Sequence, residues 1–160
     1  MFDDMDNKTL GKRVLCWVIP LAVGGLSALV SGGMGGYEAL NQPPLSPPRW
    51  VFPFVWIALY VAMGEASFRV LRSGAEPKRI KKALIAYGVQ LAINFLWSPV
   101  FFRGQMYLTA FFVLIALWIG VFVTLRRFAA INETAGDLII PYILWVTFAG
   151  YLNLGVYLLN

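Results

Sequence analysis

The sequence predicts an all-α integral membrane protein, a bundle of five transmembrane helices with a long Gly/Pro-rich loop between the first helix and the second. The 160 residues are 59% hydrophobic and only 13% charged, and a soluble domain of this size could not cover so much apolar surface. A transmembrane helix needs about 20 mainly apolar residues to cross a hydrocarbon core of roughly 30 Å. Charge-free windows of that length lie at 14–37, 83–102, 104–125 and 138–160, and a fifth window, 50–68, is interrupted only by Glu65.

The chain starts with a polar N-terminal tail, residues 1–12. We expect the first helix at about 13–30, where Pro20 and Gly24 either bend the helix or let a neighbour approach closely. A cleavable signal peptide is the competing interpretation, because a basic pair at 12–13 precedes the apolar run. The length of that run favours a retained helix.

The segment 31–50 reads SGGMGGYEALNQPPLSPPRW and contains four glycines and four prolines. Such a composition cannot form one regular helix or strand. Loops of this length in compact domains are often lids or binding loops. Prolines restrict the backbone, so we expect a stiff lid and not a flexible linker.

The remaining helices are expected at about 51–71, 80–102, 106–128 and 136–158, so that residues 13–160 form one membrane domain. The connections after the second, third and fourth helices are short. Consecutive helices should therefore be antiparallel neighbours.

The basic residues are divided unequally between the two sides of this bundle. Of 13 Lys and Arg residues, 11 fall on the side of the N-terminus, and the other side holds Arg49 and Arg103. Because basic residues accumulate in cytoplasmic loops, we expect a cytoplasmic N-terminus and an outer C-terminus in a bacterial cell membrane. The positive charge thus reports topology, and we expect no nucleic-acid partner.

The chain has no histidine and a single cysteine, Cys16. A disulfide within the chain and a zinc site of Cys and His ligands are therefore excluded. We expect no metal site and no required cofactor.

One face of the helix at 80–102 combines aromatic rings with amides, at spacings of three and four residues that place them on one side: Tyr87, Gln90, Asn94, Trp97 and Phe101. An amide in hydrocarbon needs a hydrogen-bond partner, which predicts that this face points into the bundle. The opposite face carries Gly88 and Ala92, whose spacing permits close contact with another helix or a second subunit.

Two other helices carry similar faces, formed by Trp56 and Tyr60 at 51–71 and by Tyr142, Trp145, Ala149 and Asn153 in the last helix. We expect the three faces to converge on a pocket beneath the loop. Taken singly, each residue is more often core packing or an interhelical hydrogen bond than a ligand contact.

Two charged residues have alternative interpretations. Glu65 lies four residues before Arg69, a spacing typical of an ion pair on one helix face; a proton-relay role is the weaker alternative. Arg49, beside Trp50 at the base of the loop, could bind a ligand carboxylate such as a propionate. An ordinary membrane-interface anchor explains Arg49 equally well.

Three segments, YEALNQPPLSPPRWVFPFVWIALY, QLAINFLWSPVFF and PYILWVTFAGYLN, resemble the TspO/MBR family of tryptophan-rich sensory and translocator proteins. The resemblance implies a five-helix bundle that binds porphyrins and, in many members, sterols and benzodiazepine-type ligands under the first loop. It also implies a homodimer, often formed through the third helix. By similarity the ligand contacts are Tyr37, Pro47, Trp56, Asn94, Trp97, Ser98, Trp145 and Ala149.

The sequence departs from the family pattern at several positions. Residues 45–48 read Leu-Ser-Pro-Pro where the family has Trp-Thr-Pro-Pro, and Phe111 stands where many members carry an acid. No basic residue follows Tyr151 or Tyr157, which the family's weak sterol-recognition pattern requires. This absence counts against a sterol ligand.

We therefore expect a receptor or transporter-like membrane protein that binds protoporphyrin IX or heme, in tetrapyrrole transport, sensing or stress regulation. The macrocycle would stack on Trp56, Trp97 and Trp145, with Gln90 and Asn94 as hydrogen-bond partners. The first alternative is a light- and oxygen-dependent porphyrin-degrading enzyme, in which Trp56 and Trp145 act as redox or quenching partners. The second is a sterol-binding or scaffold membrane protein.

Overall fold

The computed structural model describes residues 2–160, and their side chains from Asn7 onward. Five of its helices are long and apolar enough to span a membrane, which confirms the predicted fold class. They are α1 (Phe2–Ser31), α2 (Val51–Leu71), α3 (Pro77–Ser98), α4 (Tyr107–Ala129) and α6 (Ile140–Leu159). The short elements are η1 (Tyr37–Ala39), η2 (Pro99–Arg103) and α5 (Glu133–Asp137).

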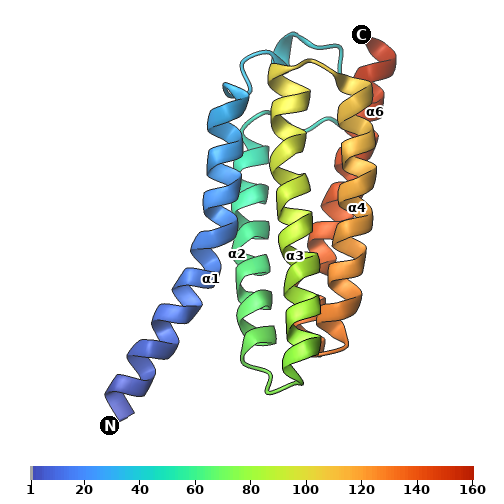
Figure 1. The fold of residues 1–160 in the computed structure, drawn as a ribbon. Coiled ribbons are helices and arrows are strands. Elements are labelled where there is room, and N and C mark those ends of the chain that lie inside the picture. Colours follow the sequence, from blue (N-terminus) through green and yellow to red (C-terminus); the bar gives the residue numbers. More distant parts are fainter. Residues whose placement is uncertain (1) are drawn as a thin grey trace.

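The spanning helices form a ring (Figure 1). Helix α1 packs against α2 and α3, α3 packs against α4, and α4 packs against α6. Aromatic contacts close the ring between α2 and α6: the ring centroids of Phe52 and Trp145 are 5.9 Å apart, and those of Trp56 and Tyr142 are 6.1 Å apart. The first loop crosses the end of the bundle that holds the C-terminus (Figure 1).

Helix α1 begins earlier than the sequence suggested, because residues 2–12 of the expected polar tail are helical. Met1 lies outside the described residues. Three aspartates precede Asn7, and negative charge stabilises a helix N-terminus. Pro20 lies inside α1, where a proline removes one hydrogen bond and bends a helix. The N-terminal part of α1 leans away from the bundle (Figure 1).

Prolines also mark the points where α3 changes its helix type and where α6 begins. Pro99 has no N–H to donate to the carbonyl of Phe95, and α3 passes at this point into the wider turns of η2. The Ser27 hydroxyl of α1 donates instead to the Phe95 carbonyl at 2.8 Å. The carbonyl that Pro99 leaves free therefore forms a hydrogen bond between α1 and α3. The last expected helix, 136–158, is split into α5 and α6, with Pro141 in the first turn of α6.

The first loop is fastened to the end of α6. Asn41 donates its backbone N–H to Asn160 Oδ1 at 3.0 Å, and Asn160 Nδ2 donates to the Asn41 carbonyl at 2.9 Å. The Tyr151 hydroxyl donates to the Pro44 carbonyl at 2.7 Å. Gly155 has no side chain because a Cβ there would meet the ring of Pro43. These contacts agree with the expected stiff lid.

Helices α1 and α2 touch at Gly64. A Cβ at this position would lie 2.6 Å from the Cys16 carbonyl oxygen and 2.6 Å from Trp17 Cα. These are backbone atoms, which cannot rotate away as the end of a side chain could. The absence of a side chain at Gly64 therefore sets the spacing between the two helices.

We predict that Gly64→Ala lowers the free energy of unfolding by roughly 1–3 kcal/mol, the usual range for overpacking a tight contact. Gly25→Ala is the matched control, because Gly25 is also inside a helix and a Cβ there meets nothing within 4 Å. Thermal unfolding of the purified protein in one detergent measures both. Equal unfolding temperatures for the two variants would contradict the packing argument.

Candidate ligand-binding site

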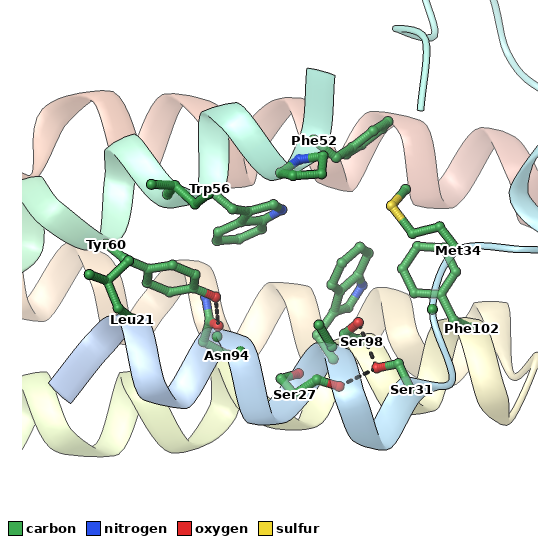
Figure 2. Close-up of a pocket in the computed structure, with 17 residues that line it drawn as sticks. Leu21, Ser27, Ser31, Met34, Phe52, Trp56, Tyr60, Asn94, Ser98 and Phe102 are labelled. Carbon is green, nitrogen blue, oxygen red and sulfur yellow. Dashed lines mark hydrogen bonds between the residues drawn. The ribbon is translucent and has the colours of Figure 1, made fainter. Parts of the chain in front are cut away.

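A cavity of about 310 Å³ lies between α1, α2 and α3, in the half of the bundle nearer the first loop (Figure 2). Its walls are mostly apolar and contain a few polar groups, as is typical of small-molecule sites. The lining residues are Leu21, Gly24, Gly25, Ser27, Ala28, Ser31, Gly33, Met34, Phe52, Pro53, Trp56, Ile57, Tyr60, Asn94, Trp97, Ser98 and Phe102.

The α2 wall is aromatic, with Phe52, Trp56 and Tyr60 spaced four residues apart along one helix face. The rings of Trp56 and Tyr60 are stacked, with centroids 5.6 Å apart and an interplanar angle of 26°. Gly24 of α1 makes room for this arrangement, because a Cβ there would overlap the Tyr60 ring. The cavity thus has a flat aromatic surface facing a smooth helix.

A chain of buried hydrogen bonds holds Tyr60 and Asn94 in place. The Tyr60 hydroxyl donates to Asn94 Oδ1 at 2.8 Å, and Asn94 Nδ2 donates to the Tyr142 hydroxyl at 2.7 Å. The Tyr142 hydroxyl donates in turn to Gln90 Oε1 at 2.8 Å. This polar chain, Tyr60–Asn94–Tyr142–Gln90, joins α2, α3 and α6. An amide has two N–H groups and two oxygen lone pairs, and the side-chain hydrogen bonds of Asn94 to described residues use one of each.

A second amide positions Trp97. The indole N–H of Trp97 donates to Asn153 Oδ1 at 3.0 Å, and Asn153 Nδ2 donates to the Tyr107 carbonyl at 2.7 Å. Asn153 is buried, with 1% of its surface exposed. Asn153 therefore holds the Trp97 ring in its orientation from behind and does not itself line the cavity.

Apart from Leu21, the α1 wall is built from small residues: Gly24, Gly25, Ser27, Ala28 and Ser31. Two of them also tie α1 to α3. Ser27 Oγ donates to the Phe95 carbonyl, and Ser31 Oγ donates to Ser98 Oγ at 2.8 Å. The α1 wall therefore projects few large side chains into the cavity, and hydrogen bonds hold it against α3.

The loop residues Tyr37, Pro47 and Arg49 lie outside the cavity, around a groove of about 770 Å³ on the outer surface. The Tyr37 ring packs edge-on against Phe52, with centroids 5.2 Å apart, and its hydroxyl donates to the Pro47 carbonyl at 3.3 Å. Burial raises the pKa of the Tyr37 phenol above its ordinary value. Met34 and Pro53 line both the groove and the cavity, so the two spaces are adjacent.

The structure brings five of the predicted ligand residues to the cavity: Trp56, Tyr60, Asn94, Trp97 and Ser98. The α6 residues do not line it. Tyr142 lies behind Trp56, Trp145 packs against Phe52, and Ala149 is buried in the core. Gln90 is fully buried behind Asn94. Helix α1 forms the wall that we expected from α6.

The sequence analysis missed this α1 wall, although it carries a signal. Gly24, Ser27, Ala28 and Ser31 are small residues at spacings of three, one and three, which places them on one helix face. Such a face permits close packing of helices, and nothing in the pattern says whether a helix or a cavity lies against it. Phe102 was also missed, because it lies beyond the change of helix type at Pro99.

Among the side chains described, from Asn7 onward, no group of three or more His, Cys, Asp or Glu residues is placed to hold a metal ion. The polar groups at the cavity are amides and hydroxyls. They suit hydrogen bonding and orientation of a ligand.

Comparison with known proteins identifies the chain's relatives. The TspO/MBR family model matches residues 16–158. The "Tryptophan-rich protein TspO" of Chlorobaculum tepidum is 35% identical over 156 residues, which cover 96% of this chain and 99% of the relative. "Protein CrtK" of Rhodobacter capsulatus is 36% identical over 86% of this chain and 85% of its own. The "Translocator protein" of Bos taurus is 33% identical over 85% of this chain and 82% of its own.

We predict that Tyr142→Phe lowers the free energy of unfolding by roughly 1–2 kcal/mol, because Asn94 Nδ2 and Gln90 Oε1 both lose their partner in the core. Tyr157→Phe is the control, since Tyr157 is 42% exposed. Thermal unfolding in detergent measures the difference. If Tyr142→Phe were no less stable than the control, the polar chain would not stabilise the bundle.

Proposed function

The chain belongs to the TspO/MBR family, and from this premise we propose that it is a receptor or transporter-like membrane protein that binds porphyrins in the cavity between α1, α2 and α3. Its role would lie in tetrapyrrole transport, sensing or stress regulation. The observation that carries the proposal is the aromatic wall of the cavity. Trp56 and Trp97 lie there with Tyr60 along mostly apolar surface, and flat conjugated ligands stack on such rings.

The size of the cavity suggests how a macrocycle would sit. A volume of about 310 Å³ is at the lower end of the range of small-molecule sites, roughly 300–1,000 Å³. Five lining residues are also exposed: Gly25, Ala28, Gly33, Pro53 and Ile57. The cavity is therefore open between α1 and α2, and we propose that a tetrapyrrole inserts one edge there.

The adjacent outer groove supports a role for Arg49. Pro53 borders both spaces, and Arg49 lines the groove with an exposed side chain. A propionate at the outer edge of the macrocycle could reach this guanidinium, which pairs well with carboxylates. Asn94 would hydrogen-bond at the inner edge with its remaining N–H or lone pair.

We predict that Ala28→Phe weakens protoporphyrin IX binding about tenfold or more, a loss of about 1.4 kcal/mol, because the new ring fills the cavity from the α1 wall. Ala22→Phe is the matched control, because Ala22 lies on the same helix, is exposed and does not line the cavity. Quenching of tryptophan fluorescence by added protoporphyrin IX gives both affinities.

Two outcomes would contradict the proposal. A flat titration of the unmodified protein would exclude porphyrin binding. Equal affinities of the two variants would place the ligand elsewhere on the protein. Parallel titrations with heme, a sterol and a benzodiazepine-type compound test the alternative ligands under the same conditions.

A second candidate function is porphyrin degradation driven by light and oxygen. Trp56 lines the cavity, and Trp145 lies behind it against Phe52. The indole N–H of Trp145 is buried and has no hydrogen-bond partner among the described residues. Such orphaned groups are uncommon in a folded interior. The Tyr87 hydroxyl is a second one among the described residues, and we propose a role beyond packing for Trp145 because it lies next to the cavity wall.

We expect Trp56→Phe and Trp145→Phe to slow the loss of porphyrin absorbance under illumination if this second function is correct. Trp118→Phe is the control, since Trp118 lies on α4 beside Phe122, away from the cavity. Absorbance decay at matched porphyrin occupancy is the measurement. Equal decay rates in all three variants would exclude a specific photochemical role for Trp56 and Trp145.

Assembly and orientation remain part of the proposal. Gly88 and Ala92 are exposed on the outer face of α3, and a Cβ at Gly88 would meet nothing within 4 Å. We propose that this face forms a homodimer contact. We also propose a bacterial cell membrane location with the N-terminus cytoplasmic, because the basic residues gather at that end.

A further inference from the structure

At the end of the bundle opposite the cavity, three arginines line a surface groove of about 530 Å³, here called the arginine groove. One arginine lies on α1, one on α2 and one directly after the end of α2. Among the described side chains that line it, Glu65 is the only acid, so this lining carries net positive charge. Its lining residues are Thr9, Leu10, Arg13, Glu65, Phe68, Arg69, Arg72, Ser73 and Asn132. The cavity proposed for porphyrin shares none of these residues.

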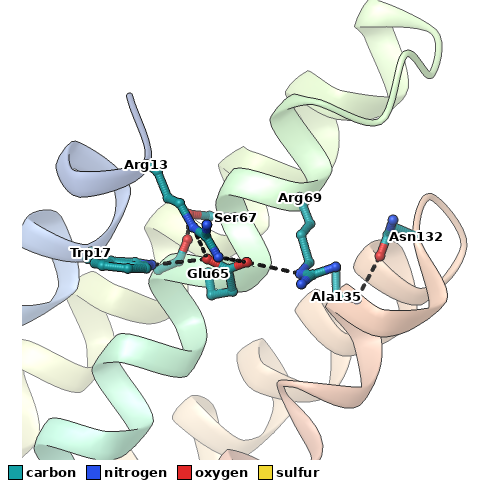
Figure 3. A network of polar contacts seen from close by, with 8 residues as sticks. Arg13, Trp17, Glu65, Ser67, Arg69, Asn132 and Ala135 are labelled. Carbon is teal, nitrogen blue, oxygen red and sulfur yellow. Dashed lines mark hydrogen bonds and ion pairs between the residues drawn. The ribbon is translucent and has the colours of Figure 1, made fainter. Parts of the chain in front are cut away.

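Glu65 organises two of the three arginines (Figure 3). Arg13 donates from Nε and Nη2 to the two carboxylate oxygens at 2.8 and 2.9 Å, and Arg69 donates from Nε at 3.1 Å. Trp17 adds an indole N–H at 3.2 Å. The ion pair with Arg69 predicted from the sequence is confirmed. The Arg13 partner was not predictable, because 52 residues separate it from Glu65.

The third arginine is held independently of Glu65. Arg72 donates from Nη1 to the Thr9 hydroxyl at 2.9 Å. Its guanidinium carbon lies 5.9 Å from the centre of the Phe68 ring, and that of Arg13 lies 5.6 Å from the same ring. Both contacts are within cation–π range. Phe68 thus holds two guanidiniums close together along the groove.

These contacts leave several guanidinium N–H groups of Arg69 and Arg72 without a partner among the described residues. A guanidinium has five N–H groups, and the hydrogen bonds among the described residues use only Nε of Arg69 and Nη1 of Arg72. The side chains of Arg13 and Arg69 are each 41% exposed. Guanidinium groups match the oxygens of phosphate in charge and geometry.

The groove lies at the end of α2, which we infer to be at the depth of the lipid headgroups. Helix α2 ends at Leu71, one residue before Arg72. Glu65 is six residues inside this end, or about 9 Å at 1.5 Å per residue. The end of the bundle that holds the groove also carries most of the basic residues.

We propose that the arginine groove binds the phosphate of an anionic membrane lipid. Basic pockets between membrane helices suit such headgroups. Leu10 and Phe68 provide apolar surface beside the guanidiniums for the glycerol and upper acyl chain, and Ser73 and Asn132 provide further polar groups. A soluble phosphate would use the same arginines but would gain nothing from the apolar surface. The proposal does not depend on porphyrin binding.

The test measures lipid preference in nanodiscs of phosphatidylcholine, using spin-labelled phosphatidylglycerol and spin-labelled phosphatidylcholine as probes. The unmodified protein should immobilise phosphatidylglycerol preferentially, and the preference should fall as salt is raised. Arg72→Gln should reduce the preference about fivefold, as expected for one basic residue at a membrane surface. This variant leaves the contacts of Glu65 unchanged.

Arg127→Gln is the matched control. Arg127 lies on the same side of the bundle, donates to the Lys82 carbonyl at 2.7 Å and is outside the groove. Its replacement changes the net charge equally without loss of the site. Arg72→Lys, which keeps the charge but not the fork of donors, should retain more of the preference than Arg72→Gln.

Three results would overturn the proposal. The unmodified protein could show no preference for phosphatidylglycerol. Arg72→Gln and Arg127→Gln could reduce the preference equally, which would indicate general surface charge. Inorganic phosphate at millimolar concentration could abolish the preference at constant ionic strength, which would identify the groove as a site for soluble phosphate.

Discussion

A polar side chain buried in a membrane bundle must find its partner within the protein, and the polar chain Tyr60–Asn94–Tyr142–Gln90 meets this requirement for three helices together. The same hydrogen bonds bring α2, α3 and α6 into one arrangement and turn the Tyr60 and Asn94 side chains toward the cavity. The aromatic wall of the site therefore depends on a buried network, most of which no ligand would touch.

The position of α1 depends on two glycines that lack side chains and on one backbone carbonyl left without a helical partner. Gly64 and Gly24 lack side chains where α2 would clash with α1, and Pro99 leaves free the Phe95 carbonyl that Ser27 uses. These local features place a smooth helix opposite the aromatic wall. A space remains between them because the α1 residues at this level are small, while Phe52, Trp56 and Tyr60 are held from behind by α6 and α3.

The two ends of the bundle have different chemistry. Near the C-terminus, a proline-rich loop is hydrogen-bonded to α6 and borders the cavity. At the other end, three arginines and one glutamate line the arginine groove. The cavity and the arginine groove thus lie toward opposite ends of the bundle. In this arrangement α1 and α2 contribute to both sites, and their contact at Gly64 lies between them.

The sequence by itself determined the membrane class, the five spans, the polar faces of α3 and α6 and the Glu65–Arg69 pair, because hydropathy and helical periodicity are local properties of the chain. Only the tertiary structure decided which of these faces meet. It paired Arg13 with Glu65, turned Tyr142 and Asn153 into supports behind the site, and gave α1 the cavity wall expected from α6. Helical spacing shows which residues share a face, whereas the neighbour of that face depends on the order of helices around the ring.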